Sequence, residues 1–145
     1  MHTLIPLLHQ GKFSCVIRKG DAVRTFMQRG VADLFHLLTT DAPFLLGCSI
    51  ADKVVGKGAA ALMVKGGVAQ VYADVISAPA LALLQRHGIA VSYAEVAEGI
   101  RNRAGTDMCP VEKRCLPLEN IDEMVDEIRD FLMQIKGENQ HKIEV

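Results

Sequence analysis

A cysteine and a glutamate three positions apart are the residues in this sequence best suited to chemistry. Cys109 and Glu112 enclose a Pro-Val dipeptide, and two cations, Lys113 and Arg114, follow. Neighbouring cations lower the pKa of a cysteine thiol and so increase the fraction of thiolate, which is the nucleophile. Glu112 is then a candidate general base for Cys109. This group predicts a metal-independent enzyme of the acyl- or sulfur-transfer kind.

Cysteine catalysis usually also needs a histidine that orients the nucleophile. None of the five histidines stands at a spacing from Cys109 that indicates this role. Cys109 therefore has a second interpretation, as a structural loop cysteine, and the sequence favours it. Glu112 likewise has the alternative of a solvent-exposed side chain.

A second group of candidates comes from two places where an apolar run meets an expected helix. Ser49 and Asp52 fit the capping-box pattern, and Ser77 precedes an Ala-Pro pair that is typical of a first helical turn. In an open α/β sheet, ligands bind where helices begin at the carboxyl ends of parallel strands. Free N–H groups at two such helix N-termini favour an anion. The sequence therefore predicts that a small anionic or nucleotide-like molecule binds near Ser49, Asp52 and Ser77.

Two lysines support the same expectation. Lys53 and Lys57 are four residues apart, so on a helix at 52–65 they share one face and add positive charge near the ligand. The alternatives are that Asp52 only completes the helix cap with Ser49, and that both lysines lie on a solvated edge.

The remaining cysteines lack the spacing of a metal site. The chain has no C-x-x-C pair, and the gap between Cys109 and Cys115 is wide for a zinc knuckle. Disulfides are not expected, because the N-terminus shows no secretion signal. Cys15 and Cys48 stand in apolar runs and are predicted to be core residues. We therefore expect no metal and no other cofactor.

Composition predicts that these residues belong to one soluble domain. The chain has 145 residues, 50% of them hydrophobic, with 16 Lys and Arg against 17 Asp and Glu. The net charge of −1 argues against nucleic-acid binding through bulk electrostatics. No apolar run approaches the roughly 20 residues of a membrane helix. We expect a cytoplasmic protein with one domain at residues 1–136 and a polar tail at 137–145.

The elements that must position the candidates follow from hydrophobic periodicity and turn signals. A hairpin followed by alternating strands and helices predicts an α/β fold, a three-layer α-β-α sandwich with a mixed, roughly five-stranded sheet. The expected strands are 13–18, 22–27, 44–50, 68–76 and 89–93, and the expected helices are 4–9, 31–38, 52–65, 77–87 and 121–136.

Two further features concern partners. The irregular segment 94–118 is long for a compact domain, which favours a functional role, and we expect it to fold over the ligand. Within it, Arg101 and Arg103 suit a phosphate or carboxylate. The expected helix at 52–65 is rich in Gly and Ala, so close packing across a homodimer interface is a third interpretation.

The order of elements resembles the cytidine deaminase-like fold. Zinc deaminases carry His/Cys-x-Glu at one helix start and Pro-Cys-x-x-Cys at the next. At the corresponding places Pro79 is present, but Ala80 and Leu83 replace the cysteines, and Asp52 stands without a His, Cys or Glu partner. Because zinc generates the hydroxide in that chemistry, the resemblance implies a deaminase-like fold without zinc-deaminase activity.

Nearly the whole chain is also similar to an uncharacterised prokaryotic family, a domain of unknown function within that superfamily. Three segments carry this similarity: 51–60, 72–77 and 108–112. The family has no established reaction, so the resemblance implies a fold and candidate positions. Two hypotheses follow. The protein binds a small anionic ligand at two helix N-termini, or it uses Cys109 catalytically with Asp52, Lys53 or Glu112 as acid–base partner.

Overall fold

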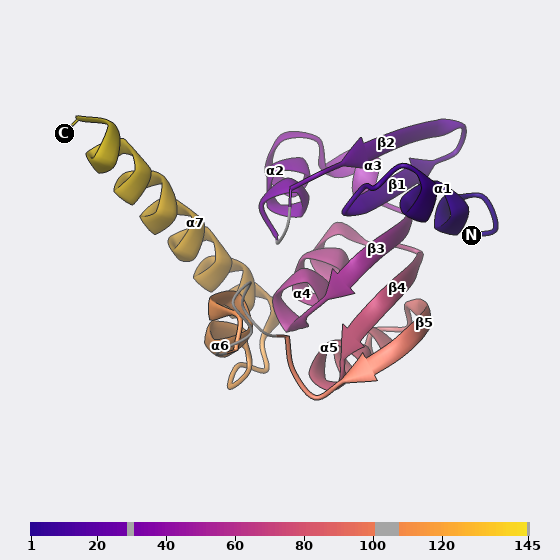
Figure 1. Ribbon diagram of the computed structural model, residues 1–145. Helices are drawn as coiled ribbons and strands as arrows, with labels where there is room; N and C mark the ends of the chain where they lie inside the picture. The colour runs from indigo at the N-terminus through magenta and orange to yellow at the C-terminus, as the bar shows by residue number, and fades with distance from the viewer. Residues whose placement is uncertain (29–30, 101–107, 145) are drawn as a thin grey trace.

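One mixed sheet of five strands forms the centre of the protein (Figure 1). The computed structural model describes residues 1–28, 31–100 and 108–144, and the side chains among them up to residue 136. The strands are β1 (Cys15–Lys19), β2 (Ala22–Phe26), β3 (Ser49–Val55), β4 (Gln70–Ser77) and β5 (Ala90–Ala97). Their order across the sheet is β2-β1-β3-β4-β5. β1 is antiparallel to β2 and β3, whereas β3, β4 and β5 are parallel, which confirms the predicted α/β class and mixed sheet.

The N-terminal strands form the hairpin that the sequence predicts. Gly20 adopts a φ of 57° in the turn, a conformation that glycine tolerates without a Cβ clash. The register pairs Lys19 with Ala22 at the turn and Cys15 with Phe26 at the open end. The open end of the hairpin therefore lies beside the later part of β3, where Cys15 pairs with Asp52.

Two helices connect the parallel strands. α4 (Lys57–Gly66) joins β3 to β4 and ends at Gly67, whose φ is 75°. α5 (Ala78–Arg86) joins β4 to β5, and its first turn is capped by the Ser77 hydroxyl, which accepts the N–H of Ala80 at 3.2 Å. The predicted cap at Ser77 is thus confirmed.

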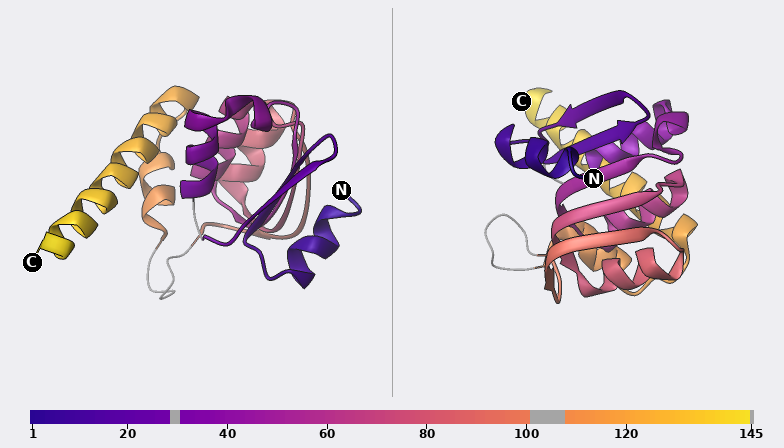
Figure 2. Two further views of the ribbon diagram at one scale, coloured as in Figure 1. Left: turned by 90° about the horizontal axis from the view of Figure 1, so that it is seen from above. Right: turned by 90° about the vertical axis from the view of Figure 1, so that its right-hand side faces the viewer.

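Helices cover the two faces of the sheet unequally (Figure 2). One face carries α4 and α5 together with the other larger helices, and it holds most of the apolar core. On the other face, Leu4 and Leu8 of the N-terminal helix pack against Val16 and Ala51. The expected second helical layer is therefore formed by a single seven-residue helix. The remaining helices are α1 (Leu4–Gln10), α2 (Ala32–Thr40), α3 (Ala42–Leu45), α6 (Pro110–Cys115) and α7 (Ile121–Glu144).

The expected strand at 44–50 is wrong for most of its length. α3 occupies the beginning of that run, because Pro43 fits a first helical turn. Gly47, with a φ of 75°, then turns the chain into β3. Phe44 and Leu45 remain buried, so the apolar run does belong to the core, but as part of a helix. A short apolar run has no periodicity that separates a buried strand from a buried helix.

The expected helix start at Asp52 is also wrong. Residues 49–55 are a strand because their backbone pairs with β1 on one side and with β4 on the other. This pairing outweighs the local capping pattern of Ser49 and Asp52, and helix α4 begins only after Gly56. Lys53 therefore lies on a strand, so Lys53 and Lys57 do not share a helix face.

The C-terminal part is more regular than expected. β5 continues to Ala97, and α6 lies within the stretch 94–118 that the sequence predicts to be irregular. α7 runs to Glu144, whereas a polar tail was expected after Lys136. Arg101 and Arg103 lie outside the described residues.

No helix in the described part of the chain is long and apolar enough to cross a membrane.

Candidate functional site

A pocket lies where the open end of the β1–β2 hairpin meets β3 and the first turn of α2. Its volume is about 370 Å³. The pocket combines carboxyl groups, lysines and apolar walls in one place. The lining residues are Lys12, Ser14, Cys15, Ile17, Phe26, Met27, Gln28, Asp33, Leu34, Asp52, Lys53 and Val54.

Asp52 is the most strongly perturbed carboxyl group in the pocket. Burial raises its pKa to about 7, and the negative charge of Asp74 on β4 acts in the same direction. Hydrogen bonds from the N–H groups of Val54 and Lys53 and from the Cys15 thiol oppose this shift, the first at 3.2 Å. At neutral pH, Asp52 therefore exists as a mixture of acid and carboxylate. Such a group donates or accepts a proton with little cost.

Cys15 stands opposite Asp52 across the β1–β3 pair, and its thiol is hydrogen-bonded to the Asp52 side chain. Burial raises its pKa well above the ordinary value, and the charges of Asp52, Asp33 and Cys48 add to this effect. Cys15 is therefore a neutral hydrogen-bond donor in the pocket rather than a nucleophile. Its burial confirms the predicted core position, but its contact with Asp52 is a feature that the sequence analysis missed.

A second carboxyl group and a fixed hydroxyl complete the polar part of the pocket. Asp33 stands in the first turn of α2, and burial raises its pKa against the opposing hydrogen bond from Gln28 and the charge of His36. The Ser14 hydroxyl lies 3.0 Å from the Phe26 carbonyl oxygen and 2.8 Å from that of Gln28. These contacts hold the end of the hairpin in place.

Glu112 lies in a different place, in the first turn of α6. Its side chain is only 2% exposed. One carboxylate oxygen accepts the backbone N–H of Lys57 at 2.7 Å, and the other accepts the Ser77 hydroxyl at 3.1 Å. Burial raises the pKa of Glu112, while these two hydrogen bonds and the charge of Lys57 lower it. The N-termini of α4 and α5 therefore do hold an anionic group, and that group is the chain's own carboxylate.

Lys57 and the two glycines beside it allow α6 to pack closely against the start of α4. The Lys57 ammonium group donates to the carbonyl oxygens of Leu116 and Leu118, at 2.8 and 2.7 Å, and the side chain is buried. A Cβ atom on Gly56 would lie 2.2 Å from a Glu112 oxygen, and one on Gly58 would lie 2.4 Å from the Val111 side chain. The small residues at the start of α4 thus serve packing within the chain. A homodimer across this helix stays a prediction.

The candidates predicted from the sequence fall into separate groups. Lys57, Ser77 and Glu112 meet where α6 packs on the N-termini of α4 and α5, whereas Asp52 and Lys53 line the pocket. Ser49 belongs to neither group, because it begins β3 and its hydroxyl accepts the side-chain N–H of Gln70 at 2.8 Å.

Cys109 precedes α6, and its backbone N–H donates to the Ile100 carbonyl oxygen at 2.6 Å. Both carboxylate oxygens of Glu112 accept hydrogen bonds, from the Lys57 N–H and the Ser77 hydroxyl, and its role as base for Cys109 stays a prediction. Cys115 is fully buried, and burial with the Glu112 charge raises its pKa to about 11. All four cysteines are free.

The described side chains contain no group of three or more His, Cys, Asp or Glu residues that is arranged to hold a metal ion. Ala80 and Leu83, which the sequence resemblance sets against the zinc-binding cysteines of deaminases, are buried apolar residues of the core. The donor set in these positions does not fit zinc.

Comparison with known proteins gives the family. The profile described as "Domain of unknown function (DUF1893)" matches residues 3–132. The chain belongs to the DUF1893 family. The crystal structure of a DUF1893 family protein (TM1506) from Thermotoga maritima is similar, with a TM-score of 0.82 and 26% sequence identity over 89% of this chain and 87% of that one. No curated protein matches the chain. The family match includes both the pocket and the Glu112 group.

Proposed function

We propose that this DUF1893 domain binds a small molecule with an amino-heterocyclic edge and an anionic group, and that the binding place is the pocket around Asp52. The observation that carries the proposal is the Asp52 carboxyl group inside a pocket of about 370 Å³, with a pKa of about 7. A protonated carboxyl group donates one hydrogen bond and accepts another. An amino group beside a ring nitrogen, as in a nucleobase, offers the matching acceptor and donor.

The rest of the pocket suits the other parts of such a ligand. Phe26 and Leu34 supply apolar surface for a ring, and Asp33 supplies a second acceptor for amino groups. Lys12 and Lys53 supply positive charge for a phosphate or carboxylate. Two acids and two lysines in one pocket favour a ligand that carries both hydrogen-bond donors and an anionic group over a simple inorganic anion.

This proposal places the ligand away from the N-termini of α4 and α5. Glu112 already receives the hydrogen bonds of Lys57 and Ser77 there. The ligand's anionic group is therefore assigned to Lys12 and Lys53.

We also infer that the domain is a cytidine deaminase-like fold that keeps a pocket without zinc. Support comes from the hairpin followed by three parallel strands and from the apolar residues at Ala80 and Leu83. Without a metal-bound hydroxide, a pocket of this kind binds an amino-heterocycle without deaminating it.

The test is a thermal-shift and calorimetric comparison of CMP, AMP, UMP and ribose 5-phosphate at neutral pH. CMP or AMP is expected to raise Tm by about 5 °C or more at saturation, and ribose 5-phosphate by much less. Asp52→Ala is expected to abolish the shift. The control is Asp21→Asn, an exposed carboxylate in the turn at the other end of the hairpin. Equal binding by Asp52→Ala and the wild type, or no shift with any amino-nucleotide, would contradict the proposal.

A further inference from the structure

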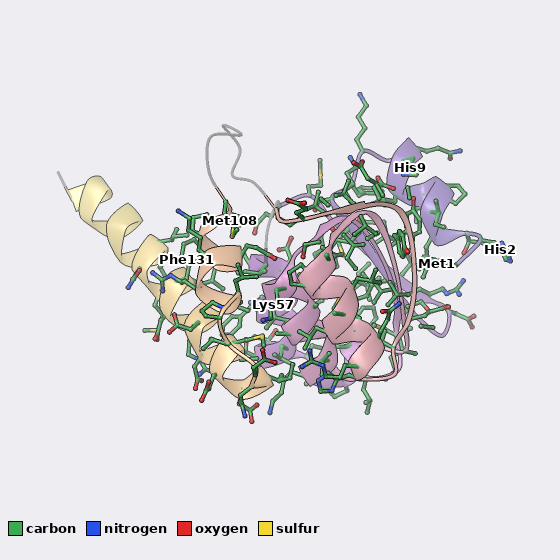
Figure 3. All side chains as sticks on the ribbon, turned by 90° about the horizontal axis from the view of Figure 1, so that it is seen from below. Met1, His2, His9, Lys57, Met108 and Phe131 are labelled. Carbon is green, nitrogen blue, oxygen red and sulfur yellow. The ribbon has the colours of Figure 1, made fainter. Side chains whose placement is uncertain are left out.

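A single residue at the start of α4 holds α6 at both of its ends. The backbone N–H of Lys57 binds the carboxylate of Glu112 in the first turn of α6, at 2.7 Å. The side chain of the same lysine binds the carbonyl oxygens of Leu116 and Leu118 just after α6. Figure 3 shows Lys57 between the α6–α7 pair and the rest of the domain.

The place that receives Glu112 is shaped for a carboxylate. Two donors reach it from different helices, the Lys57 N–H from α4 and the Ser77 hydroxyl from the start of α5. Helix N-termini attract negative charge. Gly56 leaves room for the nearer oxygen, because a Cβ atom in its place would lie 2.2 Å from that oxygen. A side chain of another shape or charge therefore does not satisfy the same donors.

α6 depends on its contacts with other elements. It has six residues, and a helix of that length is not stable alone in water. Val111 and Cys115 are buried in the main core, and Arg114 forms an ion pair with α7. Toward α4 and α5, Glu112 and Lys57 make the polar contacts that fix α6 over the two helix N-termini.

We propose that residues 108–118 form a latch, here called the α6 latch, which the Glu112 carboxylate holds closed across the N-termini of α4 and α5. When the latch opens, the sheet stays folded, and Lys57, Ser77 and both helix N-termini become accessible at the carboxyl ends of β3 and β4. The protein therefore has a closed and an open form. This proposal uses none of the pocket residues and is independent of the proposed function.

Hydrogen exchange followed by mass spectrometry tests the latch. In Glu112→Gln, which keeps the shape but loses the charge, amides of residues 110–118 are expected to exchange about tenfold faster or more. Amides of the strands are expected to keep the protection of the wild type. Glu119→Gln is the control, since the Glu119 side chain is exposed and forms a surface ion pair with Arg86. Unchanged protection of α6 in Glu112→Gln would overturn the proposal, as would equal loss of protection throughout the sheet.

Chemical rescue separates the charge from the rest of the side chain. In Glu112→Ala, formate at constant ionic strength is expected to slow exchange in α6 several-fold, because its carboxylate fits between the donors of Lys57 and Ser77. Chloride at the same ionic strength is the control. No effect of formate beyond that of chloride would contradict the carboxylate as the group that closes the latch.

Lys57→Met covers the case in which neither Glu112 variant folds. This variant keeps the backbone N–H that binds Glu112 but frees the carbonyl oxygens of Leu116 and Leu118. Faster exchange in α6 with unchanged strands is again expected. Protection equal to that of the wild type would count against the latch.

Discussion

Asp52 combines two properties that conflict in a residue with a purely structural role. Its carboxyl group is half-buried beside Cys15 at the end of the hairpin, and its pKa lies near 7. Above neutral pH the Asp52 carboxyl group ionises in the folded protein, and this lowers the free energy of unfolding. Carboxyl groups with shifted pKa values in pockets are typical of binding and catalytic sites, which is why the account places the ligand here.

The pH dependence of stability tests this shift. The folded-state pKa of Asp52 is raised from 3.8 to about 7, so the folded protein binds the proton more tightly than the unfolded chain does. The bound proton therefore adds on the order of 2–4 kcal/mol to the free energy of unfolding. This contribution is complete below about pH 4 and is lost as the pH rises through 7.

We expect Asp52→Asn to remove this loss. Relative to the wild type, the variant gains stability between pH 5 and pH 8, as measured by urea denaturation at each pH. Asp21→Asn serves as the exposed control. Parallel curves for the wild type and Asp52→Asn would show that Asp52 has an ordinary pKa.

The cysteines differ in accessibility, and alkylation distinguishes them. Cys15, Cys48 and Cys115 are buried, and burial raises the pKa of each thiol. Cys109 is partly exposed. Iodoacetamide is therefore expected to modify Cys109 first in the native protein, and the other three only on unfolding. Comparable rates at all four positions, followed by mass spectrometry of peptides, would contradict the packing described for β1 and α6.

Among the elements, the close approach of α6 to α4 makes the strongest demand on the sequence. Gly56→Ala places a Cβ atom 2.2 Å from a Glu112 oxygen, so either α6 moves or the hydrogen bond to Lys57 breaks. We expect a loss of about 1–3 kcal/mol in the free energy of unfolding. Gly99→Ala is the matched control, because the new atom would lie 3.6 Å from Met108, an ordinary contact. Equal stability of the two variants would show that α6 is not packed so closely.

Elements with a local signal could be predicted from the sequence. The hairpin follows from a glycine turn between two strand-like runs, and the start of α5 follows from Ser77 as its cap. The boundary between β3 and α4 could not be predicted, because Ser49 and Asp52 match a helix cap while distant strands pair with both edges of the segment.

The candidate site was predictable only in its parts. Asp52, Lys53, Ser77 and Glu112 were identified by type and position, but not their grouping. Glu112 and Lys57 are 55 residues apart, and no periodicity connects them. The pairing of Cys15 with Asp52 depends on the register of β1 against β3 in the same way.

In the whole molecule, the pocket and the α6 latch are separate structural features near the carboxyl ends of the parallel strands. The pocket is formed by the N-terminal hairpin, β3 and α2, whereas the latch is formed by the C-terminal α6 on α4 and α5. Both lie within the part of the chain that matches the DUF1893 family. Ligand binding and latch opening are therefore measurable independently.

The central claim is that the ligand binds at Asp52 rather than at the helix N-termini. An NMR titration of the ¹⁵N-labelled protein with CMP or AMP tests it most directly. The account predicts that the amide signals that move first belong to the pocket, around Cys15, Asp33 and Asp52, while those of residues 110–118 stay in place. Signals that move instead around Lys57 and Ser77, or no movement with either nucleotide, would contradict it.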